Sequence, residues 1–222
     1  MNREDGALYI DVYSDVICPW CYVGKRRLER ALGQVGDGLN VEVTWRPFQL
    51  NPTMPREGMD RRAYLEAKFG TVEAYRQLEE QVSAAGSEEG MSFAFEKIAR
   101  TPNTFLAHRL IWHAGEQGCQ DAVVESLFRG FFQEGVDLGS PAVLAHLAER
   151  AGLQAEGFLR GDEGTAEVQS EEAVSRRLGI RAVPYFVLDH AYGIPGAQPA
   201  EVFVAAIAKI RMRERGASTG KR

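Results

Sequence analysis

The residues best suited to chemistry in this sequence are two cysteines separated by two positions, in Cys18-Pro19-Trp20-Cys21. A C-x-x-C pair serves either as half of a structural zinc site or as a redox pair, and such zinc sites need four ligands. The chain has one further cysteine, Cys119, and four scattered histidines. Two inert buried thiols are a third interpretation, but the start of a helix is a poor place to bury both. The sequence therefore favours a redox-active dithiol and predicts no metal site.

The motif lies where a strand is followed by a helix. Residues 7–14 mix β-branched and aromatic side chains and predict a strand, whereas residues 22–32 have the apolar periodicity of a helix. Proline suits the first helical position, which leaves Cys18 at the cap. We expect the amides of Trp20 and Cys21 to point at the Cys18 sulfur and, with the helix dipole, to stabilise its thiolate. Cys18 is then the nucleophile, and Cys21 resolves its mixed disulfides.

The rest of the chain predicts an α/β fold. Residues 39–48 alternate apolar and polar side chains and predict a second strand, so the chain begins with a parallel βαβ unit. Helical periodicity dominates residues 60–179, with a loop expected at residues 86–90. A hairpin and a closing helix are predicted after that, over residues 185–188, 191–194 and 200–212.

This order predicts a thioredoxin-like fold, βαβ…ββα, that is divided by a large all-helical insertion. The core is expected to comprise residues 1–54 and 178–222, and the insertion residues 55–177. Because a strongly helical pattern is inserted between the two halves of an α/β core, we expect it to form a lid that packs over the core and shapes the cleft beside Cys18.

Three regions of the sequence resemble one known family. They are SDVICPWCYVG at residues 14–24, TPNT with AHRL between residues 101 and 110, and AVPYFV with GIPGAQ between residues 182 and 198. Together they resemble the DsbA-like thioredoxin-fold oxidoreductases, specifically the FrnE-like branch, which is related to the 2-hydroxychromene-2-carboxylate isomerases. The resemblance extends over residues 7–210 and implies a DsbA-like fold with thiol–disulfide activity.

The resemblance also implies a substrate-binding role for the loop before the hairpin. In the thioredoxin fold the residue that matches Pro184 is cis and packs beside the dithiol, so we expect a cis bond between Val183 and Pro184. The backbone of Val183 would then pair with an extended peptide. A trans proline that begins an edge strand is the alternative.

Four further residues are candidates for substrate contact. Asn51 follows the second strand and is expected at the same rim as the dithiol, although a simple turn also explains it. Trp20 is either a platform for substrate or part of the buried helix face. Asn103 begins a helix that either faces the site or needs a plain cap. His108, on the same helix, is either a site residue or an interior histidine.

Composition limits the classes of partner. The net charge of −5 gives no electrostatic footprint for nucleic acid, and no apolar run reaches the length of a membrane span. Residues 1–6 lack the apolar region of a secretory signal, so we expect a cytoplasmic protein. Lys25, Arg26 and Arg27 are expected to be solvated. The sequence is compatible with a monomer or a homodimer.

Three functions remain open at this point. The first is a protein disulfide oxidoreductase that acts on disulfides or thiols of proteins and peptides. The second is a glutathione-dependent isomerase or transferase acting on a small molecule, although such relatives typically carry serine at the position of Cys18. The third is a non-enzymatic module that binds polypeptides, which does not require both cysteines. No cofactor is expected, with glutathione left open as a co-substrate, and Cys119 is expected to be dispensable.

Overall fold

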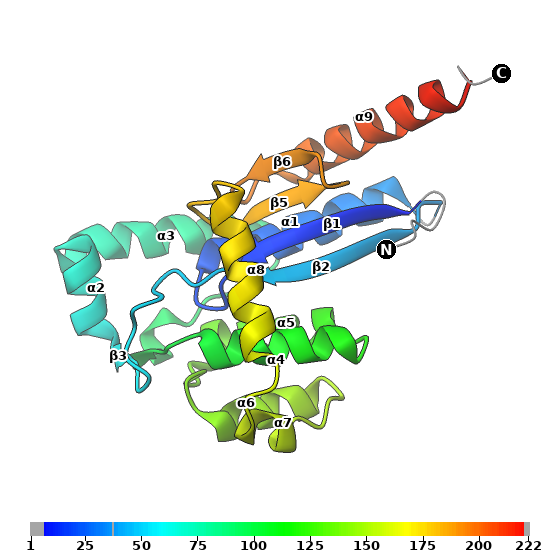
Figure 1. Ribbon diagram of the computed structural model, residues 1–222. Coiled ribbons are helices and arrows are strands. Elements are labelled where there is room, and N and C mark those ends of the chain that lie inside the picture. Colours follow the sequence, from blue (N-terminus) through cyan, green and yellow to red (C-terminus); the bar gives the residue numbers. More distant parts are fainter. Residues whose placement is uncertain (1–6, 37, 220–222) are drawn as a thin grey trace.

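The computed structural model describes residues 7–36 and 38–219, and its centre is a four-stranded sheet. The strands follow the order β2-β1-β5-β6 across the sheet (Figure 1). Their bounds are Leu8–Ser14 for β1, Val41–Pro47 for β2, Tyr185–Leu188 for β5 and Tyr192–Pro195 for β6. β1 and β2 are parallel, whereas β5 is antiparallel to both of its neighbours, β1 and β6.

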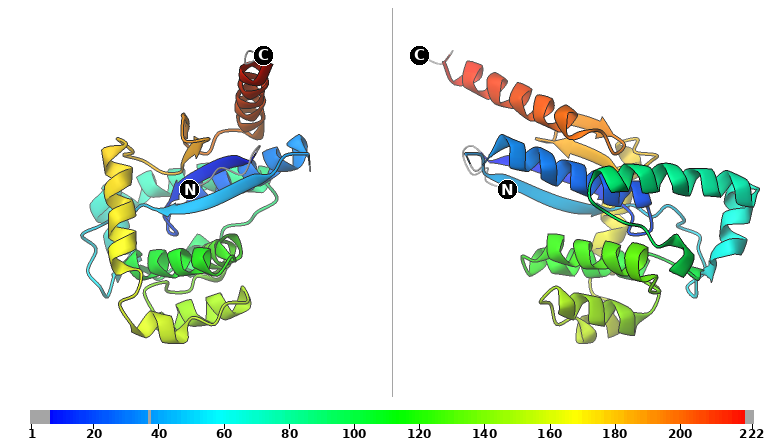
Figure 2. Two further views of the ribbon diagram at one scale, coloured as in Figure 1. Left: turned by 45° about the vertical axis from the view of Figure 1, so that its right-hand side comes forward. Right: turned by 180° about the vertical axis from the view of Figure 1, so that it is seen from behind.

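Two long helices, α1 (Pro19–Val35) and α9 (Ala200–Thr219), lie next to each other on one face of this sheet (Figure 2). Side chains of successive residues in a strand point to opposite faces. Phe186 lies on the face of the sheet that these helices cover, because its ring packs edge-to-face on Phe203 of α9, with ring centroids 4.8 Å apart. Both aromatic rings are fully buried, so the contact contributes to the main core.

The chain between β2 and β5 is mostly helical. Its helices are α2 (Arg61–Phe69), α3 (Val72–Glu88), α4 (Phe105–Glu116), α5 (Gln120–Arg129), α6 (Pro141–Arg150), α7 (Glu156–Arg160) and α8 (Thr165–Arg177). A 3-10 turn η1 (Phe95–Lys97), a π-helical turn η2 (Gly130–Glu134) and a two-residue pairing of β3 (Met59–Asp60) with β4 (Arg100–Thr101) complete it. Helices α4, α5 and α8 contact β2, and α3 contacts α1 (Figure 1).

The predicted α/β architecture is confirmed. The parallel pairing of β1 with β2 and the strand bounds of β5 agree with the sequence pattern. The hairpin turns at Asp189 and His190, which both have positive φ, and Leu188 pairs with Tyr192, so three residues connect the two strands. Gly179 has a φ of +75° just beyond α8, the conformation expected of a residue that terminates a helix.

Two local expectations were wrong. Gly86 lies inside α3 instead of in a loop, because the ring of Phe93 packs directly on it; a Cβ there would lie 2.5 Å from Cε2 of Phe93. Lys25 is 2 % exposed instead of solvated. Its ammonium group bonds to Glu29 and to Asp121 of α5, and although burial opposes the charge, these carboxylates raise its pKa.

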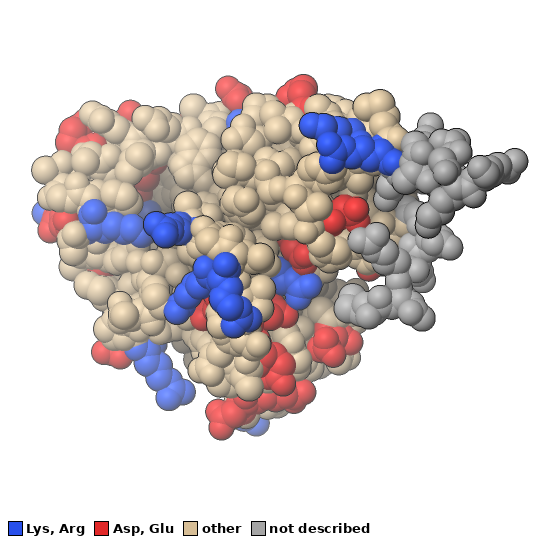
Figure 3. Space-filling view, turned by 45° about the horizontal axis from the view of Figure 1, so that its top comes forward, with Lys and Arg blue, Asp and Glu red and all other residues tan. Residues whose placement is uncertain are grey.

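The described surface carries both signs of charge. On the face drawn in Figure 3, acidic and basic side chains are interspersed among uncharged ones. None of the helices within residues 7–36 and 38–219 has the length and apolar content needed to cross a membrane.

Candidate active site

The turn between β1 and α1 holds the two thiols in a fixed geometry. Cys18 is the residue before α1 and has an extended backbone, with Pro19 in the first turn of the helix. The amide of Cys18 donates to the carbonyl of Asp15 at 3.0 Å, and the amide of Cys21 donates to the carbonyl of Cys18 at 3.0 Å. These two backbone bonds set the direction in which both side chains leave the turn.

The sulfur of Cys18 points toward the loop before β5. Its thiol donates to the carbonyl of Val183, with sulfur and oxygen 3.6 Å apart. The expectation that the Trp20 and Cys21 amides would bond to this sulfur was wrong, since within the described part of the chain Cys18 makes no side-chain cap bond. The reason is that the Cys21 amide is already engaged by the Cys18 carbonyl.

The two thiols differ in burial and in environment. Cys18 is 6 % exposed and Cys21 only 1 %. Burial raises the pKa of Cys21 well above its ordinary value, and the neighbouring Cys18 raises it further, whereas the Ser14 hydroxyl and the Asp15 backbone act in the opposite direction. Both thiols are reduced in this structure. Of the two buried residues, Cys18 is therefore the less enclosed.

The peptide bond between Val183 and Pro184 is cis, the geometry that the sequence led us to expect. Gly24 of α1 makes this arrangement compact. A Cβ at Gly24 would lie 3.0 Å from Cγ of Pro184 and 3.1 Å from Cζ of Phe186, which is tighter than ordinary packing. Helix α1 can thus approach the proline loop closely only because residue 24 has no side chain.

A cavity of about 300 Å³ lies beside the motif, and the helical insertion forms most of its wall. Pro19 and Trp20 contribute one side of it. Most of the remaining lining is apolar or aromatic and comes from α2, α3, η1 and η2, with the charged side chains of Arg61, Lys68 and Glu79 among it; it includes Tyr64, Leu65, Phe69, Tyr75, Phe95 and Phe132. The insertion therefore packs over Pro19 and Trp20 of the motif, although neither cysteine lines this cavity, and its role as a lid over Cys18 stays a prediction. Trp20 faces this cavity.

Asn51 is connected to the same cavity through side-chain hydrogen bonds. The Tyr64 hydroxyl donates to Oδ1 of Asn51 at 3.0 Å and accepts from Nζ of Lys68 at 2.6 Å. Nδ2 of Asn51 is buried and has no hydrogen-bond partner among the described residues. Asn51 is thus more than a turn residue, because it links the rim of the sheet to α2.

Asn103 and His108 have structural partners instead of facing the cavity. Nδ2 of Asn103 donates to the carbonyl of Met54 at 2.7 Å, and its Oδ1 accepts from the amide of Phe105. His108 is 3 % exposed, with Nε2 lying 3.5 Å from Oδ1 of Asp15. The suggested substrate contacts of these two residues are therefore replaced by a helix-start role and an interior role.

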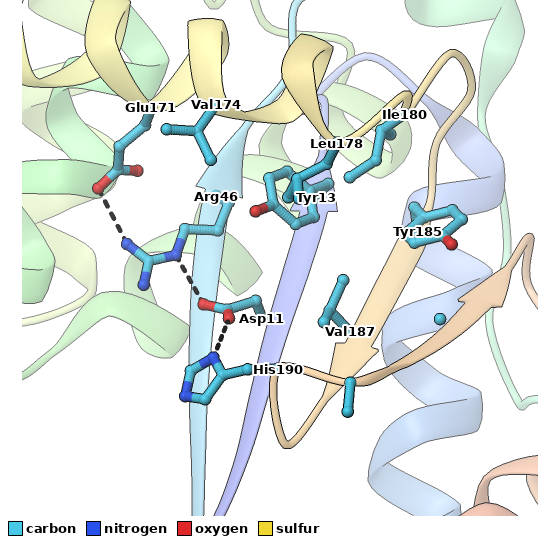
Figure 4. Close-up of a pocket in the computed structure, with 12 residues that line it drawn as sticks. Asp11, Tyr13, Arg46, Glu171, Val174, Leu178, Ile180, Tyr185, Val187 and His190 are labelled. Carbon is cyan, nitrogen blue, oxygen red and sulfur yellow. Dashed lines mark hydrogen bonds and ion pairs between the residues drawn. The ribbon is translucent and has the colours of Figure 1, made fainter.

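A larger hollow of about 570 Å³ lies between α8 and the face of the sheet that is opposite to α1 and α9 (Figure 4). Arg46 bonds to Asp11 at 2.7 Å and to Glu171 at 2.9 Å, and Nδ1 of His190 lies 3.5 Å from the other oxygen of Asp11. Neither cysteine of the motif lines it. These side chains pair with one another, so we interpret them as a structural ion-pair cluster that joins the sheet to α8.

The described residues give no support for a metal centre. No group of three or more His, Cys, Asp or Glu side chains is close enough there to hold an ion.

Sequence reasoning missed the parts played by Asp15, Gly24, Tyr64 and Lys68. Asp15 and Gly24 belong to the quoted motif and stand out as a lone acid and a glycine in an apolar setting. No pattern marks Tyr64 or Lys68.

Comparison with known proteins agrees with this geometry. A family model described as a DSBA-like thioredoxin domain matches residues 9–208. The chain belongs to that family. It is 30 % identical over 208 residues to the uncharacterized protein YwbO of Bacillus subtilis (strain 168), with 90 % of this chain and 96 % of YwbO covered.

Solved structures of the DsbA-like type are similar along the whole chain. A probable DsbA oxidoreductase, SCO1869 from Streptomyces coelicolor, is 35 % identical with a TM-score of 0.82, covering 97 % of this chain and 91 % of that one. A 2-hydroxychromene-2-carboxylate isomerase is 17 % identical with a TM-score of 0.69, covering 95 % and 98 %, which shows the fold alone. The protein is thus a member of a family of DsbA-like thiol oxidoreductases.

Proposed function

We propose that this protein is a thiol–disulfide oxidoreductase that works through a mixed disulfide on Cys18. The observation that carries the proposal is the position of the Cys18 sulfur, 3.6 Å from the carbonyl of Val183 and next to the cis bond of Pro184, with Cys21 buried behind it. A nucleophile, a resolving thiol and the backbone of Val183, which would pair with substrate, then meet at one point.

In the reducing direction, the Cys18 thiolate attacks one sulfur of the substrate disulfide. The substrate S–S bond breaks, a bond forms between Cys18 and that sulfur, and the other substrate sulfur leaves as a thiolate that takes up a proton. The Cys21 thiolate then attacks Cys18, and the remaining substrate thiolate is released. Two electrons have passed from the dithiol to the substrate, and Cys18 is joined to Cys21. The oxidising direction is the reverse of these steps.

The substrate is a protein or peptide disulfide in this proposal. An extended chain would lie along the backbone of Val183 and pair with it through main-chain hydrogen bonds, which tolerate varied sequence. An apolar side chain next to the substrate cysteine would enter the cavity beside Trp20.

The test is the turbidimetric reduction of insulin with dithiothreitol. Wild type should accelerate precipitation, and Cys18→Ser should abolish the acceleration. Cys119→Ser, at a half-buried thiol outside the motif, is the matched control and should retain the wild-type rate. Equal rates for wild type and Cys18→Ser would reject the proposal and leave a binding module as the better interpretation.

A glutathione-dependent reaction on a small molecule is the second candidate, because the cavity of about 300 Å³ beside Trp20 suits a ring system. It makes a different prediction for the resolving thiol. An isomerase of this kind would need no disulfide between the two cysteines, so Cys21→Ser would keep its activity toward a small aromatic substrate with glutathione. The oxidoreductase would lose turnover in the same variant.

A further inference from the structure

Two ionisable side chains meet in the interior directly before the Cys-Pro-Trp-Cys motif. Asp15 is 0 % exposed and His108, on α4, is 3 % exposed. Oδ1 of Asp15 and Nε2 of His108 lie 3.5 Å apart, and neither atom has a hydrogen-bond partner among the described residues. A buried polar atom without a partner costs free energy, so these two atoms satisfy each other when a proton lies between them.

Asp15 also contacts both thiol residues through its backbone. Its carbonyl accepts from the amide of Cys18 at 3.0 Å, and its backbone bonds to the thiol of Cys21. The second carboxylate oxygen, Oδ2, accepts from the amide of Leu50 at 2.8 Å. Asp15 therefore joins the active-site turn, the segment after β2 and helix α4 of the insertion.

We propose that Asp15 and His108 are positioning residues that hold this turn and set the reduction potential of the Cys18–Cys21 pair through their combined charge. The inference rests on the dithiol chemistry proposed above. Thiolates exist only in the reduced form, and a buried carboxylate three residues before Cys18, without a compensating partner, disfavours that form. In the intact pair the imidazole of His108, with Nε2 3.5 Å from Oδ1, faces the Asp15 carboxyl group and offsets its effect on the thiols, which favours the reduced form.

Three variants separate this role from simple packing. His108→Gln removes the imidazole that faces the Asp15 carboxyl group and should shift the equilibrium toward the disulfide by about threefold or more. Asp15→Asn removes the carboxylate and should shift it toward the dithiol. The double variant should match Asp15→Asn, because no carboxylate is left for residue 108 to offset. His113→Gln, also on α4 but stacked on Phe158, is the matched control and should leave the equilibrium unchanged.

The experiment equilibrates the whole protein with mixtures of glutathione and glutathione disulfide. The protein dithiol passes two electrons to glutathione disulfide, giving the Cys18–Cys21 disulfide and two glutathione molecules. Alkylation followed by mass spectrometry gives the oxidised fraction, and circular dichroism checks that each variant folds. Should His108→Gln not fold, the shift in Asp15→Asn still decides the question.

The outcomes distinguish the inference from the function on which it rests. Opposite shifts of the two single variants, with the double variant equal to Asp15→Asn, support the pair. Identical equilibria in all variants, or additive shifts in the same direction, would overturn the inference while leaving the oxidoreductase intact. A wild type that forms no Cys18–Cys21 disulfide in any glutathione mixture would reject both.

Discussion

Gly24 offers the sharpest test of how α1 and the proline loop are held together. A methyl group at residue 24 would lie 3.0 Å from Pro184 and 3.1 Å from Phe186, so Gly24→Ala forces one of these neighbours to move. Overpacking of this kind costs about 1–3 kcal/mol of folding free energy. Glycine to alanine in a helix interior otherwise stabilises by about 0.5–1 kcal/mol, so the net destabilisation should be about 0–2.5 kcal/mol.

Gly33 is the matched control, because it lies in the same helix and a Cβ there meets nothing within 4 Å. Gly33→Ala should therefore stabilise the protein, and the two variants should differ by about 1–3 kcal/mol in unfolding free energy. Urea unfolding followed by circular dichroism measures this difference. Because Pro184 lies beside Cys18, Gly24→Ala should also slow insulin reduction, whereas Gly33→Ala should not. Equal stability and equal activity of the two variants would refute the close approach of α1 to the loop.

Three more predictions concern single side chains. At neutral pH iodoacetamide should label Cys18 well before Cys21, whose pKa burial raises; equal labelling, mapped by mass spectrometry, would contradict the assignment. Lys25→Met should lower the unfolding free energy, measured with urea, by about 2–3 kcal/mol. This is less than the cost of breaking a fully buried ion pair, because the Asp121 side chain is exposed to water. Since the folded pKa of Lys25 is raised, its contribution should be complete below its ordinary pKa and lost as pH rises through the raised value; a cost that persists at higher pH would argue against the ion pair. Cys119→Ser should change neither stability nor reductase rate substantially, and loss of activity in the folded variant would require a third redox thiol.

Local patterns were enough to predict the elements that carry the dithiol. Strand periodicity and the proline after Cys18 placed the motif between β1 and α1, and the hairpin of β5 and β6 followed from its alternation and turn. These features depend on residues that are neighbours in the chain, where spacing and conformational preference act directly.

Two of the differences concern contacts between distant parts of the chain. Lys25 of α1 is buried with its ammonium group bonded to Asp121 of α5. His108 was a candidate for substrate contact, yet its partner is Asp15, which lies 93 positions earlier in the sequence. No local pattern specifies such pairs, since they arise only when the insertion folds against the core.

Trapping of the mixed disulfide tests the central claim most directly. Cys21→Ala keeps the nucleophile and removes the thiol that resolves it, so incubation with a disulfide substrate should accumulate a complex through Cys18 that dithiothreitol releases. Cys18→Ala is the matched variant and should accumulate none. A non-reducing gel followed by mass spectrometry identifies the joined residues. Trapping only in Cys18→Ala, or in neither variant, would contradict the account of Cys18 as the nucleophile beside Pro184.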